Sequence, residues 1–265
     1  MGLSGLMRHC YSLTMIAYLT TAQSRRIAYH QTRGSGPGVV FLGGFRSDMQ
    51  GIKALFLQDW AVRTGRAFLR FDYSGHGQSS GDFVDGSIGD WADDAAAALM
   101  QLTSGRQILV GSSMGGWISL LLARMHPDRI GGLVGVAAAP DFTEDSLWAG
   151  FSTQQKADLV SLGRVDLPSD YGDPAPITAR LIEDGRRNLV LRSRLAVSVP
   201  VRLLHGTADA DVPPSVGLRL LDHLDGPDVQ LTLVKAADHR FSSPDCLALI
   251  GQAIADIDQR VVRHG

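Results

Sequence analysis

Short apolar runs alternate with amphipathic stretches along most of this chain. Two strand-like segments, residues 15–21 and 26–32, flank the stretch "AQSR" and predict an antiparallel hairpin. A continuous apolar run at residues 39–44 is typical of a strand buried on both faces. From Ser47 the apolar positions repeat at helical spacing up to Gly65, and residues 67–72 predict the next strand.

The middle of the chain continues this alternation. Ser87 is a candidate N-cap, with Asp90 three residues later, for a helix that runs to Gly105. The strand at 107–111, the helix at 117–125 and the strand at 131–139 follow in order. Strands that alternate with helices predict an α/β fold with a parallel sheet covered by helices on both faces.

The alternation stops at Pro140 and resumes with the strand that begins at Val199. A structureless loop of this length is not expected in a compact domain, and helical patterns at 152–162 and 177–191 predict an inserted cap. A helix at 215–224, a strand at 229–235 and a closing helix from Asp245 complete the pattern. We predict a core domain formed by residues 18–140 and 199–262, a cap insertion at 141–198 and an N-terminal tail at 1–17.

Composition and charge narrow the classes of partner. The 265 residues are 45% hydrophobic and 20% charged, as in ordinary globular proteins, and the length fits one large domain. The net charge of −2 comes from mixed basic and acidic residues, which gives no basic footprint for nucleic acid. Cys10 and Cys246 form neither a disulfide framework nor a metal-binding spacing, so we expect a reducing compartment, no metal and no cofactor.

The apolar stretch near the N-terminus has two interpretations. Residues 9–22 follow Arg8 and resemble the apolar part of a signal peptide, but Tyr11, Ser12 and Thr14 interrupt them. We favour the alternative, a short tail that leads into the first strand. The sequence predicts no transmembrane segment, because no run approaches 18 apolar residues.

The pattern GxSxG, which marks exposed nucleophilic serines, occurs twice. A nucleophile elbow needs a strand before the serine, a tight turn at it and a helix after it. The strand at 107–111 and the helix after it flank Ser113, between Gly111 and Gly115. Ser79 has turn-forming residues on both sides. We therefore favour Ser113 as the nucleophile, with Ser112 as the next candidate.

Two backbone amides are candidates for binding an oxyanion. The helix after Ser113 presents its first N–H groups to developing negative charge, which indicates the amide of Met114. A second donor is expected from the loop after an earlier strand, here "GGFRSD", and we predict the amide of Phe45. In the alternative interpretation Gly43 and Gly44 only end that strand.

A nucleophilic serine needs a base, and the base needs an acid that fixes its tautomer. Among the histidines after the serine, His223 falls within a predicted helix and His264 lies at the terminus. His239 follows a strand and precedes the last helix, so we predict that it is the base.

The acid is predicted at the carboxyl end of a parallel strand, where ligand chemistry gathers. Asp209 is our first candidate, and Asp211 and Asp141 are alternatives. We expect His205 to pack or bond locally, and Asp238 to cap the chain or face solvent.

These motifs resemble those of the α/β-hydrolase superfamily. "GSSMGGW", "HGTADADVP" and "DHRF" occur in that order on the alternating pattern from about Tyr18 onwards. The resemblance implies a mostly parallel eight-stranded sheet with an inserted helical cap, and a triad of Ser113, Asp209 and His239. "FLGGFRSDMQGIKALFL" and "RFDYSGHGQSSGDF" are similar to the branch of mitochondrial palmitoyl-protein thioesterases that also cleave acyl glucuronides. Because the chain lacks a long basic transit segment, we expect a cytoplasmic location.

The predicted cap supplies candidate substrate contacts. Leu147, Trp148 and Phe151 are candidates for lining an apolar channel over the serine, or for packing the cap onto the body. Arg180 is our candidate for binding an anionic substrate group, and a solvated helix face is the alternative. The basic residues crowded in this region are Arg180, Arg186, Arg187, Arg192 and Arg194.

The combined hypothesis is a serine hydrolase that cleaves a small-molecule ester or thioester, or an acylated protein, through an acyl-enzyme. One alternative is an acyltransferase or perhydrolase with the same triad, and another is a non-enzymatic receptor on the same scaffold. Neither acyl chain length nor oligomeric state follows from the sequence.

Overall fold

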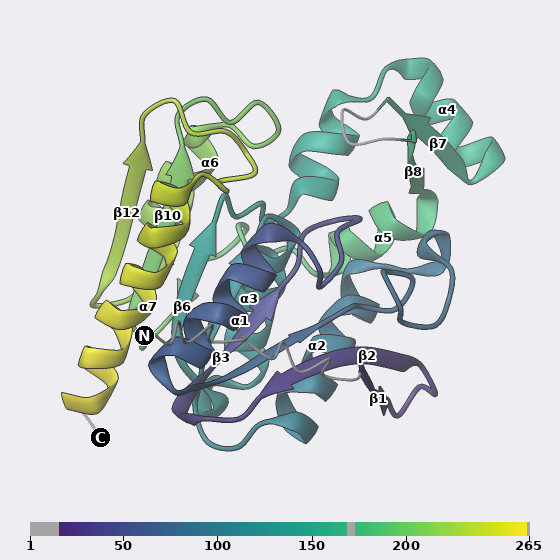
Figure 1. Ribbon diagram of the computed structural model, residues 1–265. Helices are drawn as coiled ribbons and strands as arrows, with labels where there is room; N and C mark the ends of the chain where they lie inside the picture. The colour runs from purple at the N-terminus through teal and green to yellow at the C-terminus, as the bar shows by residue number, and fades with distance from the viewer. Residues whose placement is uncertain (1–15, 169–172, 264–265) are drawn as a thin grey trace, which may run out of the picture.

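The computed structural model describes residues 16–168 and 173–263. Residues 1–15 of the predicted tail, including Cys10, therefore lie outside the described residues. An eight-stranded sheet runs through the molecule in the order β1-β2-β4-β3-β5-β6-β10-β12 (Figure 1). β1 and β2 are antiparallel neighbours at one edge, and the strands from β4 to β12 pair in parallel. The predicted fold class, a mostly parallel α/β sheet, is confirmed.

Each predicted strand of the sheet is present, with small shifts at the ends. The sheet strands are β1 (Ala17–Thr20), β2 (Arg26–Thr32), β3 (Ser35–Leu42), β4 (Arg66–Phe71), β5 (Gln107–Ser112), β6 (Ile130–Val136), β10 (Val201–Gly206) and β12 (Val229–Val234). Every residue of β5, β6 and β10 is buried, as expected for central strands of a parallel sheet covered on both faces.

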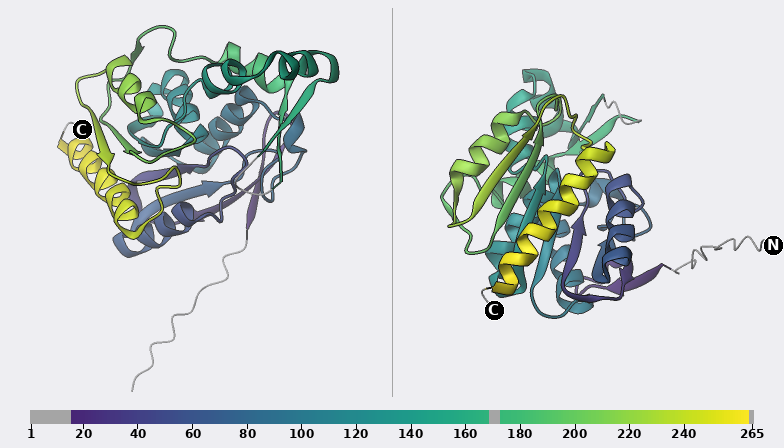
Figure 2. Two further views of the ribbon diagram at one scale, coloured as in Figure 1. Left: turned by 90° about the horizontal axis from the view of Figure 1, so that it is seen from above. Right: turned by 60° about the vertical axis from the view of Figure 1, so that its left-hand side comes forward.

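Two hydrophobic cores lie on opposite faces of this sheet. α1 (Ile52–Thr64) and α7 (Pro244–Arg263) pack on one face, where Leu57 and Ile254 are buried. α2 (Ile88–Leu102), α3 (Met114–Met125) and α6 (Pro214–His223) contribute to the core on the other face, with Trp91 and Trp117 fully buried. The second view in Figure 2 shows α7 lying across the sheet.

The start of α2 agrees with its capping signal. The Ser87 hydroxyl accepts a hydrogen bond from the Asp90 amide, as predicted, and so satisfies one of the free N–H groups of the first turn. Short connections complete the core: the 3₁₀ turns Phe83–Asp85 and Pro127–Arg129, and the parallel pair β9 (Leu195–Ala196) and β11 (Leu224–Asp225).

The segment between β6 and β10 contains more structure than its pattern predicted. A π-helix at Thr143–Trp148 precedes α4 (Thr153–Leu162), which begins with a capping box between Ser152 and Gln155. β7 (Arg164–Leu167) and β8 (Ala175–Thr178) form an antiparallel pair, and α5 (Ala179–Arg187) follows. In Figure 1, α4, β7 and β8 lie together at the end of the molecule opposite β12.

The predicted helix at 177–191 is therefore too long at both ends. Ile177 belongs to β8 and pairs with Val165, and Thr178 caps α5 by accepting a hydrogen bond from the Leu181 amide. Pairing with a distant strand overrides the helical spacing of these residues. None of the helices in the described ranges is long and apolar enough to cross a membrane.

Candidate functional site

Ser113 occupies the sharp turn between β5 and α3. Its backbone has φ 53° and ψ −117°, a conformation that is strained for a residue with a side chain. The Ser113 amide donates to the Val136 carbonyl at 2.9 Å, and the Ser113 carbonyl accepts from the amides of Gly116 and Ala139. Hydrogen bonds to β6 and the loop after it therefore hold the serine in this conformation.

The glycines around Ser113 are required by close backbone contacts. A Cβ atom on Gly115 would lie 2.1 Å from the Leu42 carbonyl oxygen, and one on Gly111 would lie 2.3 Å from the Gly115 carbonyl oxygen. A Cβ on Gly116 would lie 2.5 Å from the Cβ of Ala138. The pattern around Ser113 thus lets α3 closely approach both the end of β3 and the loop after β6.

The structure brings Ser113, His239 and Asp209 together. His239 Nε2 lies 3.1 Å from Ser113 Oγ, and His239 Nδ1 lies 2.8 Å from Asp209 Oδ2. Ser113 and His239 are partly exposed, whereas the Asp209 side chain is fully buried. The arrangement has a nucleophile, a base and an orienting acid within hydrogen-bond reach.

Asp209 is held as a carboxylate. Its Oδ1 accepts from the amides of Asp211 and Val212 at 3.0 and 2.8 Å, and His205 Nε2 lies 3.4 Å from its Oδ2. Burial raises the pKa of Asp209, but hydrogen bonds from His205 and His239 outweigh it and hold the pKa well below its usual value.

The loop after β3 passes directly beside Ser113. A Cβ on Gly44 would lie 3.4 Å from the Ser113 Cβ, which brings the following amide, that of Phe45, next to the serine. Within residues 16–168 and 173–263, no backbone acceptor is found for the Phe45 N–H. Met114 is the first residue of α3, so its N–H also has no partner within the helix. Both predicted oxyanion donors are thus close to Ser113 in the chain or in space.

The second glycine–serine pattern has a different environment. Ser79 Oγ donates to the Asp72 carbonyl and accepts from the Ala28 amide, which ties its turn to β2. No helix follows it directly. Ser112, the other alternative, is buried as the last residue of β5.

Asp141, an alternative acid, supports the end of the insertion. Its carboxylate is fully buried and accepts from the amides of Val190 and Leu191 at 2.8 and 2.9 Å. Burial raises its pKa, and these two N–H groups oppose that rise. Asp238 accepts a hydrogen bond from the Phe241 amide, so it caps the turn after His239 as expected.

The candidate channel residues of the insertion are packed between elements. Phe151 is buried, and Leu147 packs against the core that contains Trp117. The cations of Lys156 and Arg186 lie over the Trp148 ring, at 5.1 and 4.5 Å from its centroid. Trp148 lines a cavity of about 560 Å³ that Ser113 does not line.

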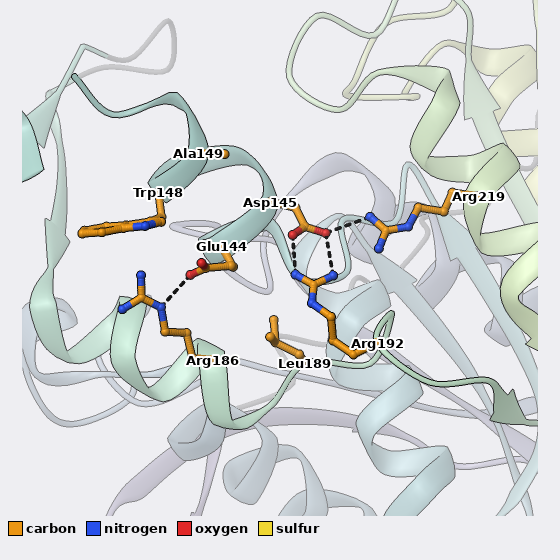
Figure 3. Close-up of a pocket in the computed structure, with 8 residues that line it drawn as sticks. All are labelled: Glu144, Asp145, Trp148, Ala149, Arg186, Leu189, Arg192 and Arg219. Carbon is orange, nitrogen blue, oxygen red and sulfur yellow. Dashed lines mark hydrogen bonds and ion pairs between the residues drawn. The ribbon is translucent and has the colours of Figure 1, made fainter. Parts of the chain in front are cut away.

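Ion pairs line this cavity (Figure 3). Arg192 makes two hydrogen bonds to the Asp145 carboxylate, which also accepts from Arg219 of α6. Arg186 donates to Glu144 at 2.7 Å. The ion pair between Asp145 and Arg219 thus joins the segment between β6 and β10 to α6.

Arg180, the candidate anion ligand, lies outside that cavity. It donates to Asp90 of α2 at 2.6 Å, and this hydrogen bond raises the pKa of Arg180. Arg187 pairs with Asp184, and Arg194 lies 4.0 Å from Asp225. The substrate-binding role predicted for Arg180 stays a prediction.

Three side chains of the site could offer ligands to a metal ion. Ligand atoms of Asp209, Asp211 and His239 lie within 4.8 Å of one another. A metal would have to break the 2.8 Å hydrogen bond between Asp209 and His239. The donor set therefore fits a hydrogen-bonded triad better than a metal site.

Comparisons with known proteins agree with this geometry. The profile of the alpha/beta hydrolase fold matches residues 41–175. The mitochondrial palmitoyl-protein thioesterase ABHD10 of Rattus norvegicus is 34% identical over 250 residues, which are 94% of this chain and 84% of the rat protein. The chain belongs to the α/β-hydrolase family.

Solved structures extend the similarity to the whole fold. The mouse ABHD10 structure is 32% identical with a TM-score of 0.86, and the match covers 93% of this chain and 99% of that one. The crystal structure of a hydrolase from Agrobacterium vitis S4 is 39% identical with a TM-score of 0.88, and the match covers 92% of this chain and 98% of that one. The family resemblance predicted from the motifs is confirmed, and as a member of this family the chain is an ester or thioester hydrolase.

The predicted cytoplasmic location is wrong by the same comparison. The ABHD10 relatives are named as mitochondrial proteins, which contradicts that expectation. The prediction rested on a missing transit segment, and the N-terminal residues on which it depended lie outside the described part of the structure.

Sequence reasoning missed two aromatic side chains beside the site. Phe142, directly before the π-helix, packs edge to face on Phe45 at 5.5 Å and on Trp117 at 5.7 Å. His76 accepts a hydrogen bond from the Arg46 amide at 3.3 Å. Neither residue has a local sequence signal, because each contact joins segments far apart in the chain.

Proposed function

We propose that the chain hydrolyses acyl esters or thioesters through a covalent acyl-enzyme on Ser113. The observation that carries this proposal is the position of His239, within hydrogen-bond distance of both Ser113 Oγ and Asp209 Oδ2. Asp209 favours the His239 tautomer with the proton on Nδ1, and this leaves the lone pair of Nε2 directed at the serine hydroxyl.

In the first half-reaction Ser113 Oγ attacks the acyl carbonyl while His239 removes its proton. The amides of Met114 and Phe45 donate to the oxyanion of the tetrahedral intermediate. His239 then protonates the leaving alcohol or thiol, and the acyl group remains on Ser113. A water molecule, deprotonated by His239, attacks the acyl-enzyme and releases the carboxylic acid.

We propose acyl thioesters, including S-acylated protein, as the first substrates to test. The support is the name of the ABHD10 relatives, palmitoyl-protein thioesterase, over 94% of this chain. We also propose that residues 141–198 form a cap that selects the acyl group. Phe142 supports this role, because it connects the insertion to Phe45 in the loop beside Ser113.

The test is a panel of p-nitrophenyl esters and acyl-CoA thioesters of graded chain length, assayed with the wild type and Ser113→Ala. We expect Ser113-dependent turnover with a preferred chain length. Ser79→Ala is the matched control, because it removes a serine from the same pattern, and it should keep its activity. An inactive wild type, or an active Ser113→Ala variant, would refute the proposal.

The alternative reactions are separated by one further measurement. An acyltransferase or perhydrolase would consume the acyl-enzyme faster when an alcohol or peroxide competes with water. A receptor would bind the ester tightly without releasing product. We expect product release at a rate that added alcohol or peroxide does not increase.

A further inference from the structure

The turn that carries the second glycine–serine pattern contacts the loop that carries Phe45. We define the oxyanion loop as residues 43–49 and the support turn as residues 72–80. The oxyanion loop follows β3 and the support turn follows β4, and these strands are parallel neighbours in the sheet. Their carboxyl ends therefore place the two segments side by side.

Three hydrogen bonds join the segments, and one of them runs from the Tyr73 hydroxyl to the Gly43 carbonyl oxygen at 3.5 Å. His76 Nε2 accepts from the Arg46 amide at 3.3 Å, and Asp72 Oδ1 accepts from the Met49 amide at 2.6 Å. Asp72 Oδ2 accepts from the Gln78 amide within the support turn. His76 and Asp72 thus hold backbone N–H groups of the oxyanion loop, one of them in the residue directly after Phe45.

A hydrogen bond and three ring contacts fix the orientation of the His76 imidazole. Its Nδ1 lies 3.1 Å from the Ser74 carbonyl oxygen, which makes Nδ1 the protonated nitrogen and leaves Nε2 as an acceptor. The rings of Tyr73, Phe83 and Trp91 pack edge to face on the imidazole at 5.7, 5.1 and 5.1 Å. Only 4% of His76 is exposed, so water does not compete for this hydrogen bond.

The burial of His76 keeps it in the neutral form that this contact needs. Burial lowers its pKa to about 4, although the hydrogen bond to the Ser74 carbonyl opposes the shift. A protonated imidazole would present an N–H to the Arg46 N–H and lose the contact. At neutral pH the His76 imidazole is therefore uncharged and keeps its hydrogen bond with the Arg46 amide.

The oxyanion loop needs such support because its backbone is strained. Arg46 has φ 59°, a left-handed conformation that is unfavourable for a residue with a side chain. The peptide between Phe45 and Arg46 is held on one side by the edge-to-face contacts of the Phe45 ring and on the other by His76. The Phe45 N–H belongs to the adjacent Gly44–Phe45 peptide, so a shift at Arg46 would change its orientation through the Phe45 Cα.

We propose that His76 is a positioning residue for the oxyanion hole, which fixes the Phe45 amide by accepting the hydrogen bond of the Arg46 amide. This inference rests on the proposed acyl-enzyme mechanism. The Phe45 N–H stabilises charge that develops only in the transition state, so loss of its orientation lowers kcat more than it changes KM.

The test compares His76→Phe, His76→Gln and Ser79→Ala with p-nitrophenyl butyrate. Phenylalanine keeps the ring packing and removes the acceptor, whereas glutamine keeps an acceptor. We expect about a 10- to 100-fold lower kcat for His76→Phe with KM within about twofold, because a full oxyanion donor contributes on the order of 10²-fold or more. Glutamine should recover most of this loss. Phenylboronic acid, whose serine adduct carries a tetrahedral anion, should bind His76→Phe more weakly by a similar factor.

Ser79→Ala is the matched control, because it removes the hydrogen bonds of the Ser79 hydroxyl to β2 and to the Asp72 carbonyl and keeps the His76 acceptor. Its kcat should stay within about threefold of wild type. A wild-type kcat in His76→Phe, an equal loss in Ser79→Ala, or a loss confined to KM would overturn the proposal.

Amide hydrogen exchange in the wild type tests the contact without any variant. The Arg46 amide should exchange slowly, and exchange as fast as that of exposed loop amides would overturn the proposal. If instead the wild type shows no Ser113-dependent turnover, the proposed function fails. If Ser113 is essential and His76→Phe is fully active, only the role of His76 fails.

Discussion

At the scale of single residues, the site depends on which nitrogen of His239 carries the proton. Asp209 Oδ2 accepts from Nδ1, and the amides of Asp211 and Val212 fix the other carboxylate oxygen. With its Nδ1 protonated, His239 can only accept at Nε2, where Ser113 Oγ lies at 3.1 Å. The acid therefore acts by selecting a tautomer and by stabilising the imidazolium that forms during attack.

Asp209→Asn should lower kcat by about 10³- to 10⁴-fold, because an amide can donate to Nδ1 and so favours the wrong tautomer. Asp211→Asn is the matched control, since Asp211 contacts the Asp209 carboxylate through its backbone amide, which the substitution keeps. Steady-state kinetics at pH 7.5 measure both. A larger loss in Asp211→Asn would transfer the acid role to that residue.

His76 also gives a pH dependence to folding stability. Its pKa is about 4 in the folded chain, against 6.5 for an ordinary histidine. Between these values the unfolded chain binds the extra proton, so the free energy of unfolding decreases as the pH falls from 6.5 to 4. Since one pKa unit corresponds to about 1.4 kcal/mol, this contribution is about 2 to 4 kcal/mol.

In His76→Gln this contribution is absent. As the pH falls from 7 to 4, the free energy of unfolding of the wild type should therefore decrease by about 2 to 4 kcal/mol more than that of the variant. Urea unfolding at several pH values measures it. Parallel pH profiles for the two proteins would show that His76 does not titrate in this way.

At the scale of elements, the elbow is built by close approach of α3 to the sheet. Gly115→Ala would place a methyl group 2.1 Å from the Leu42 carbonyl oxygen, where backbone has to move. We expect a loss of about 1 to 3 kcal/mol in unfolding free energy, together with reduced activity. Gly150→Ala is the control, because a Cβ there meets nothing within 4 Å. It should be neutral or stabilise by up to about 1 kcal/mol. Equal urea midpoints for the two variants would contradict the packing argument.

The two ends of the insertion are joined by buried hydrogen bonds of Asp141, whereas the ion pairs of Asp145 are partly exposed. Asp141→Ala leaves the buried amides of Val190 and Leu191 without acceptors, and should cost about 2 to 4 kcal/mol. Asp145→Ala removes partly exposed ion pairs and should cost less than about 1 kcal/mol.

Urea unfolding measures how much Asp141 and Asp145 stabilise the fold, and kcat measures whether either residue takes part in catalysis. Folded Asp141→Ala should keep its kcat, because its carboxylate binds backbone amides of the insertion. An inactive but stable Asp141→Ala variant would make Asp141 the catalytic acid, the alternative that the sequence left open.

At the same scale, prediction from sequence succeeded where the pattern is local. The helix capped by Ser87, the buried strand β5 and the bounds of α4 follow from periodicity and, for Ser87, from its capping signal. The π-helix and the pair of β7 and β8 were missed, because pairing between segments determines them. Trp148 has an apolar ring, and no local pattern indicates that it packs against the cations of Lys156 and Arg186.

At the scale of the whole molecule, the site is assembled by the parallel sheet. The oxyanion loop, Ser113, Asp209 and His239 follow β3, β5, β10 and β12, and all four strands end at the same edge of the sheet. This explains how residues 126 positions apart, such as Ser113 and His239, come within hydrogen-bond distance. The candidate residues were predictable from their place after strands, whereas the contacts of His76 and Asp141 required the three-dimensional arrangement.

The most direct test of the account is to identify the residue that a fluorophosphonate probe modifies. We expect peptide mass spectrometry of the labelled wild type to find the adduct on Ser113 and none on Ser79. Labelling should be lost in Ser113→Ala and retained in Ser79→Ala. An adduct on Ser79, or undiminished labelling of Ser113→Ala, would contradict the assignment of Ser113 as the nucleophile.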